Sequence, residues 1–212
     1  MAWVETERLA LVDTLRGSDP NAPTLCEGWD VRHLLAHLVQ REHSLAASIG
    51  DVVVRRPPGE EKYLGRLVEQ ARSAEGYAAL IDRFRAGPPR WSPMSWAGEN
   101  LNLVEYVIHH EDIRRGAGSA IPRVLPAEEA QAVWSKLGTF GRLSYRKSPV
   151  GVRLALPDGS SEPIKLGSEG VVLTGEPLEL ALYVSGRRRA ASVEVSGPPE
   201  TVARFESWVA TS

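Results

Sequence analysis

The segment 102–116, NLVEYVIHHEDIRRG, decides how the first half of the chain folds. At about 100° per residue its apolar side chains cover most of a helix surface, which predicts a largely buried helix. Glu105, His109 and Asp112 nevertheless share one wedge, roughly 60° wide at that pitch. Buried charges must be paired or must bind a metal. The wedge therefore predicts either a Glu105–His109 hydrogen bond or two metal ligands facing one point.

Candidates for a third ligand lie in the segment 22–42, APTLCEGWDVRHLLAHLVQRE, which predicts a turn followed by a helix. Asp30 suits the N-cap of this helix, and Gly50 suits its end. His37 lies on the flank of the apolar face, about 40° nearer its centre than His33. His37 is thus the first candidate and His33 the second. The alternative for either is a half-exposed histidine that hydrogen-bonds to the backbone.

Two other residues of this segment need an explanation. Glu42 falls on the apolar side of the helix and requires a partner, either Arg41 or an arginine from another helix. Cys26 stands near Leu25 and Trp29, which favours a buried, small apolar side chain over a reactive thiol close to a metal.

The rest of the pattern predicts an α+β protein with two domains. Helical periodicity also marks the segments 3–16, 63–85 and 126–143. We expect residues 1–145 to form an up-and-down helical bundle of four main helices plus a fifth, with Trp91 and Trp96 covering one end. Alternating short segments and two helices after Tyr145 predict a small α+β domain over residues 146–212.

Composition excludes several classes of function. A formal net charge of −2 gives no general attraction to nucleic acid or to an anionic membrane. The single cysteine excludes an internal disulfide framework and fits a reducing cytosol. The N-terminus does not have the pattern of a signal peptide, and no apolar run approaches the ~20 residues needed to span a bilayer. We therefore expect a soluble, cytoplasmic protein; its oligomeric state stays open.

Together, the segments 22–42 and 102–116 resemble the mycothiol-dependent maleylpyruvate isomerase family, which belongs to the DinB-like superfamily of metal-binding four-helix bundles. The segment 175–187, GEPLELALYVSGR, is similar to a G-x-P-x-x-L…GR pattern in the C-terminal part of that family. The resemblance implies that His37, Glu105 and His109 are metal ligands. It implies zinc as the ion, with nickel as an alternative, and mycothiol or another low-molecular-weight thiol as the cofactor.

The resemblance also implies the reaction class. A metal-activated thiolate would add to a small-molecule electrophile, as in a thiol-dependent transferase or isomerase. Arg187 is the candidate for binding an anionic group, since its fork suits carboxylates; the alternative is a solvated basic turn. Asp112 would orient a ligand or form a salt bridge. Two other hypotheses stay open: a metal-dependent hydrolase that activates water, and a non-catalytic metal-binding module.

Overall fold

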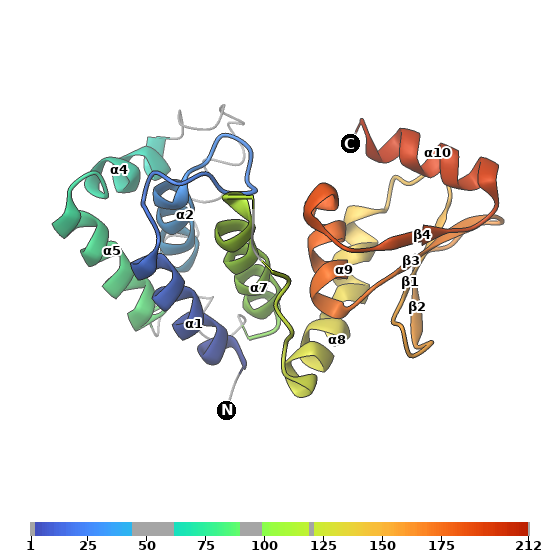
Figure 1. Ribbon diagram of the computed structural model, residues 1–212, viewed down its shortest axis with the longest axis horizontal. Helices are drawn as coiled ribbons and strands as arrows, with labels where there is room; N and C mark the ends of the chain where they lie inside the picture. Colours follow the sequence, from blue (N-terminus) through green and yellow to red (C-terminus); the bar gives the residue numbers. More distant parts are fainter. Residues whose placement is uncertain (1–2, 44–61, 90–98, 119–120, 212) are drawn as a thin grey trace. The chain divides into compact units, whose positions relative to one another are not determined.

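The computed structural model describes residues 3–43, 62–89, 99–118 and 121–211, and the chain forms two compact units, Met1–Pro122 and Arg123–Ser212 (Figure 1). The first unit is helical where it is described, and the second combines helices with a small sheet. The predicted α+β class is therefore confirmed. Trp91 and Trp96, with the end of the second helix expected at Gly50, lie outside the described residues.

The described part of the first unit consists of helices, namely α1 (Trp3–Gly17), α2 (Val31–His43), α4 (Lys62–Gln70), α5 (Ala74–Ala86) and α7 (Glu99–Gly116). Helix α1 packs against α7 and α5, and α2 packs against α4 and α5 (Figure 1). Leu11, Leu34, Leu35, Phe84 and Tyr106 are buried in the shared core. This packing fixes the faces that α2 and α7 present to each other.

Local capping explains where two of these helices begin. Asp30 Oδ1 accepts a hydrogen bond from the backbone N–H of His33 at 2.9 Å, so Asp30 caps α2 as predicted. The single helix expected over 63–85 is wrong, because the chain breaks between α4 and α5. There the Ser73 side chain accepts from the Gly76 N–H at 3.0 Å and starts α5 anew.

The second unit contains three α-helices, one short 3₁₀ helix and four strands, namely α8 (Ala127–Ser144), β1 (Gly151–Ala155), β2 (Ser161–Lys165), β3 (Gly170–Thr174), α9 (Pro177–Val184), η1 (Arg188–Ala190), β4 (Glu194–Ser196) and α10 (Pro199–Val209). The sheet order is β2-β1-β3-β4, with β1 and β3 parallel and the other pairs antiparallel. Helices α8 and α9 pack together, and α10 packs on β3.

Helix α8 was expected to be the fifth helix of the bundle, with the domain boundary after residue 145. It packs instead on α9 and β2 and belongs to the second unit, which begins at Arg123. Gly141 makes the close approach to β2 possible, because a Cβ there would lie only 2.9 Å from the Ile164 Cδ1 atom. Periodicity identifies such a helix but does not identify its partner.

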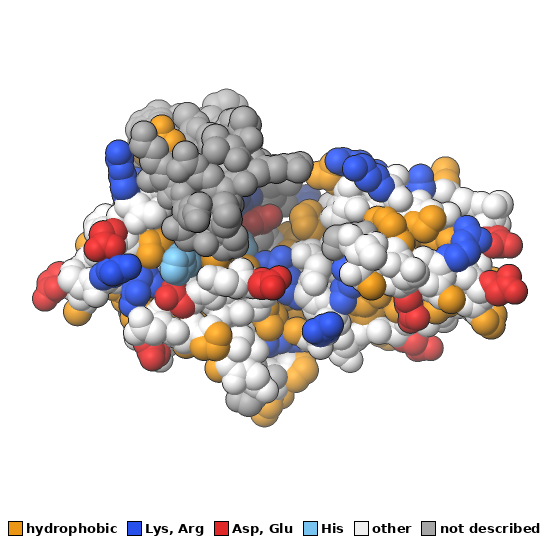
Figure 2. Space-filling view, turned by 90° about the horizontal axis from the view of Figure 1, so that it is seen from above, with side chains coloured by type: hydrophobic (Ala, Val, Ile, Leu, Met, Phe, Trp, Pro, Cys, Tyr) orange, Lys and Arg blue, Asp and Glu red, His pale blue; other side chains and the backbone are white. Residues whose placement is uncertain are grey.

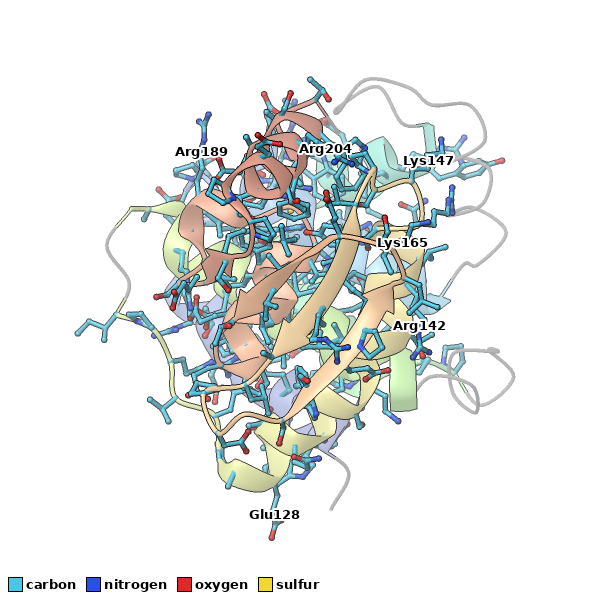
Figure 3. All side chains as sticks on the ribbon, turned by 90° about the vertical axis from the view of Figure 1, so that its right-hand side faces the viewer. Glu128, Arg142, Lys147, Lys165, Arg189 and Arg204 are labelled. Atoms are coloured by element: carbon cyan, nitrogen blue, oxygen red, sulfur yellow. The ribbon has the colours of Figure 1, made fainter. Side chains whose placement is uncertain are left out.

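The described surface carries charges of both signs. Acidic and basic side chains are interspersed on the face shown in Figure 2. Among the cations labelled on the second unit in Figure 3, Arg142 pairs with Glu162 at 2.6 Å and Arg204 with Glu169 at 3.3 Å. Within the described residues, none of the helices has the length and hydropathy needed to cross a membrane.

Candidate metal centre

Helix α7 buries an unusual number of polar side chains, which are Asn102, His109, His110, Glu111, Asp112 and Arg115. Buried polar groups are costly unless they are hydrogen-bonded. Glu111 accounts for one part of this set, because it accepts hydrogen bonds from Arg114 at 2.7 Å and from Arg115 at 2.6 Å. The buried His110 is likewise hydrogen-bonded, to side chains of α1. The remaining groups face α2 and the loop before it.

The His37, Glu105 and His109 side chains are brought together from α2 and α7, and one ligand atom of each lies within 4.8 Å of the others. His109 Nε2 lies 3.4 Å from Glu105 Oε2. The His37 and His109 rings meet edge to face, with centroids 5.3 Å apart. His109 is 6% exposed, whereas His37 and Glu105 are partly exposed. The three predicted ligands therefore form one cluster with an open side.

The second nitrogen of His109 is also occupied. Its Nδ1–H donates to Asp112 Oδ2 at 2.8 Å, and Asp112 is fully buried. This bond leaves Nε2 facing Glu105 and His37, the orientation that a metal-binding imidazole requires once Nε2 has lost its proton. Burial opposes the charged imidazolium, but hydrogen bonds with Asp112 and Cys26 outweigh it and raise the pKa of His109 well above its ordinary value.

Glu105 is held in its ionised form. Burial raises the pKa of Glu105, but the hydrogen bond with His109 and the charge of Arg41 outweigh burial and lower it to about 2. Arg41 Nε lies 3.9 Å from Glu105 Oε2, and Arg41 Nη1 donates to Asn102 Oδ1 at 3.0 Å. A carboxylate that stays charged at neutral pH is ready to bind a cation without first losing a proton.

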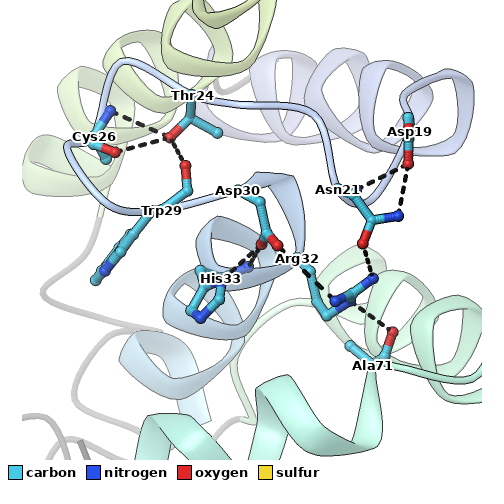
Figure 4. A network of polar contacts seen from close by, with 9 residues as sticks. All are labelled: Asp19, Asn21, Thr24, Cys26, Trp29, Asp30, Arg32, His33 and Ala71. Carbon is cyan, nitrogen blue, oxygen red and sulfur yellow. Dashed lines mark hydrogen bonds and ion pairs between the residues drawn. The ribbon is translucent and has the colours of Figure 1, made fainter. Parts of the chain in front are cut away.

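A hydrogen-bonded loop before α2 brings two further side chains to the cluster (Figure 4). The Thr24 hydroxyl donates to the Trp29 carbonyl at 2.8 Å, and the Cys26 N–H donates to Thr24 Oγ1 at 3.2 Å. The Trp29 ring lies against His37, with centroids 5.2 Å apart. The Cys26 thiol donates to Asp112 Oδ2 at 3.2 Å. Neither contact was predicted from the sequence.

Helix α7 anchors the same loop directly. The Leu25 N–H donates to the Asp112 carbonyl at 3.0 Å. Gly116 lets the loop approach the last turn of α7, because a Cβ there would lie 2.3 Å from the Pro23 carbonyl oxygen. The loop that carries Cys26 is therefore fixed to the helix that carries His109.

Several alternatives left open by the sequence are now decided. His33 is bound to Asp30, with Nδ1 2.6 Å from Oδ1, and is not part of the cluster (Figure 4). Glu42 takes its partner from another helix, because Arg8 on α1 donates to its carboxylate. Cys26 packs against the hydrophobic core, as expected, but it is only partly buried and its thiol also hydrogen-bonds with Asp112.

Arg187 lies in the second unit, between α9 and η1. Its side chain is partly exposed, and its Nη1 donates to the Ser185 carbonyl at 2.7 Å. This contact shows how the start of the turn is held but does not test the predicted role in binding an anionic group. The role of Arg187 stays a prediction.

Sequence reasoning missed one buried network on α7. His110 Nδ1 donates to Glu7 Oε1 at 2.9 Å, and the Thr14 hydroxyl lies 2.7 Å from His110 Nε2. Both His110 nitrogens are thus used within the helical unit, and the residue supports the contact between α1 and α7. Glu7 and Thr14 lie about two turns apart on α1, a spacing that could have indicated a shared polar partner.

The donor set fits a divalent metal ion. Two imidazoles and one carboxylate form the arrangement that is typical of catalytic zinc, in which coordination positions remain for water or another ligand. The same donors accept nickel and related ions. The Asp112–His109 hydrogen bond is the supporting contact that metal-binding histidines usually make.

Comparisons with known proteins identify the family and the fold of the chain. Residues 3–114, more than half of the 212-residue chain, match the family model described as the mycothiol maleylpyruvate isomerase N-terminal domain. Two solved structures have a similar fold over 92% of this chain and 93% of theirs. One is a mycothiol-dependent maleylpyruvate isomerase, with 17% identity and a TM-score of 0.52. The other is a histidine-to-alanine mutant, with 16% identity and a TM-score of 0.55. No curated protein matches the chain.

Proposed function

Because the chain belongs to the mycothiol maleylpyruvate isomerase N-terminal domain family, we propose that it is a thiol-dependent enzyme acting on a small electrophile. An isomerase that uses mycothiol is the first candidate, and a thiol transferase with the same cofactor is the second. The two solved relatives are named as isomerases of this kind, which supports the first.

We propose that His37, Glu105 and His109 hold a divalent cation, with zinc first and nickel next. The proposal is supported by the chemistry of the donors and by their separation of at most 4.8 Å. An ion bound there would lower the pKa of a coordinated thiol and supply a thiolate at neutral pH.

Each neighbouring residue has a role in this scheme. Asp112 accepts the Nδ1 proton of His109 and so keeps Nε2 available to the ion. Arg41 stabilises the ionised form of Glu105. Trp29 packs on the His37 ring and limits its rotation. Arg187, which belongs to the second unit, stays a separate proposal for binding an anionic group, because guanidinium groups bind carboxylates in two-point geometry.

The observation that carries the proposal is the meeting of His37, from α2, with Glu105 and His109, from α7. The test is metal analysis of purified protein by mass spectrometry, with His37→Ala and His109→Ala as the variants. His33→Ala is the matched control, since His33 lies on the same helix but bonds to Asp30. We expect about one ion per chain in wild type and control, and a loss of the ion in both variants.

The same proteins then separate the possible reactions. Maleylpyruvate isomerisation is followed with and without added mycothiol. We expect turnover that requires the thiol and that disappears in His37→Ala and His109→Ala while remaining in His33→Ala. Turnover of ester or amide substrates without any thiol would instead indicate a hydrolase. Equal metal content in all four proteins would contradict the ligand assignment.

A further inference from the structure

The far side of His109 carries a second group of metal-binding side chains. Cys26 Sγ, an imidazole nitrogen of His109 and a carboxylate oxygen of Asp112 all lie within 4.8 Å of one another. We propose that these three residues form a second cation site, selective for soft, thiophilic ions, that competes with the first site for His109. The inference does not require the first site to be catalytic.

The donor geometry supports a built site. Asp112 Oδ2 accepts from the Cys26 thiol at 3.2 Å and from His109 Nδ1 at 2.8 Å, so one buried oxygen lies between the other two donors. A dication bound by these ligands would replace the two protons that now lie in the hydrogen bonds of Cys26 and His109 with Asp112. The Cys26 proton would be released, and the proton on Nδ1 would move to Nε2 or be released as well.

The thiol is delivered by a rigid part of the chain. The Cys26 N–H donates a hydrogen bond to the Thr24 hydroxyl within the loop. The neighbouring Leu25 N–H donates to the Asp112 carbonyl on α7. Both bonds hold the cysteine against the last turns of α7, independently of any ion. A pre-formed site loses little conformational freedom when an ion binds.

The ligand types determine which ions would enter. The first group offers only nitrogen and oxygen, whereas the second adds a thiolate. Soft ligands of this kind favour cadmium or copper(I) over harder ions. Both groups use the same imidazole, and a neutral imidazole has a lone pair on one nitrogen only. An ion held on Nδ1 therefore leaves Nε2 protonated and weakens metal binding at the first site.

The single cysteine makes the test specific. The chain contains one cysteine, so any thiolate-to-metal charge-transfer band must come from Cys26. Metal-free protein is titrated with cadmium in buffer without thiols, and the ultraviolet band is recorded for wild type, Cys26→Ser and His37→Ala. Far-UV circular dichroism melts confirm that each variant folds.

We expect the band in wild type and in His37→Ala, where the second site is intact, and its loss in Cys26→Ser. Bound cadmium without a band in wild type would overturn the proposal and leave Cys26 as a hydrogen-bond donor to Asp112. A band that is lost in His37→Ala but present in wild type would also overturn it, because the thiolate would then belong to the first site. Failure of the first site appears separately, as metal content that is unchanged when His37→Ala is added to Cys26→Ser, in which the second site is absent.

Discussion

The buried ion pair between Arg8 and Glu42 provides the sharpest stability prediction, with Arg8→Met as the perturbation. Arg8 on α1 is 3% exposed and Glu42 on α2 is 1% exposed. The Arg8 guanidinium lies over the Phe84 and Tyr106 rings and donates to the Phe84 carbonyl at 3.0 Å. The Tyr106 hydroxyl donates to the Glu42 carboxylate. The cluster therefore joins α1, α5, α2 and α7, including both helices that carry the proposed ligands.

The expected cost follows from the burial of Glu42. Methionine keeps most of the volume of the Arg8 side chain, so the main loss is the cation that compensates the carboxylate. Removing one partner of a buried ion pair typically costs about 3–5 kcal/mol. We expect Arg8→Met to lose that much free energy of unfolding at neutral pH. Arg16→Met is the matched control, because its ion pair with Asp82 is exposed and is worth at most about 1 kcal/mol.

The assay is urea unfolding followed by far-UV circular dichroism, with hydrogen exchange of α1, α2 and α7 amides to locate the loss. The double variant Arg8→Met with Glu42→Gln removes both charges while leaving an oxygen for the Tyr106 hydroxyl. We expect it to recover about 2 kcal/mol relative to additivity, since the two residues are in direct contact. A cost of Arg8→Met below about 1 kcal/mol, or a strictly additive double variant, would refute the reasoning.

The pH dependence gives an independent check. Burial raises the pKa of Glu42, against the opposing effects of Arg8 and Tyr106, and loss of Arg8 must raise it further. Below the ordinary glutamate pKa of about 4.3 the carboxyl is protonated in both folded and unfolded chains, and the penalty vanishes. As pH rises toward the folded pKa the penalty grows by up to about 1.4 kcal/mol per unit. The deficit of Arg8→Met should therefore be larger at pH 8 than at pH 5.

Further predictions concern the candidate metal centre. Asp112→Ala should lower zinc affinity about 10- to 100-fold, because His109 loses the group that orients it. Competition with a chelator measures the zinc affinity. An unchanged affinity would exclude the orienting role of Asp112. Because the pKa of His109 is raised and that of Glu105 is lowered to about 2, protonation of His109, and not of Glu105, should contribute to a fall in metal affinity as the pH decreases from neutral. Calorimetry in two buffers counts the released protons. Gly116→Ala should destabilise the fold by about 1–3 kcal/mol through the clash with Pro23, as thermal unfolding would show.

The sequence predicts those parts of the site that depend on one helix. Glu105, His109 and Asp112 share a wedge because helical pitch alone places them there, and the structure confirms that His109 contacts both carboxylates. Helical pitch also favours His37 over His33. These inferences need no knowledge of how the helices pack, only of which face is apolar.

The remaining features depend on long-range packing and could not be predicted. Hydrophobic periodicity shows that α8 is amphipathic but not that it covers β2 instead of the bundle. The apolar pattern continues across Ser73, so only a local cap marks the break between α4 and α5. The apolar neighbours of Cys26 predict a buried apolar side chain, whereas its partial exposure and the direction of its thiol depend on the loop that the bond between Leu25 and Asp112 holds in place.

The charges around His109 explain why this ring suits a cation at either end. Its Nε2 faces Glu105 and its Nδ1 faces Asp112, so the imidazole lies between two carboxylates. Arg41 offsets one of these charges, and a proton on the ring offsets the other. A divalent ion that replaces this proton adds one further positive charge to the cluster. That excess would favour an anionic ligand such as a thiolate at the open side, and binding at one end of the ring would weaken binding at the other.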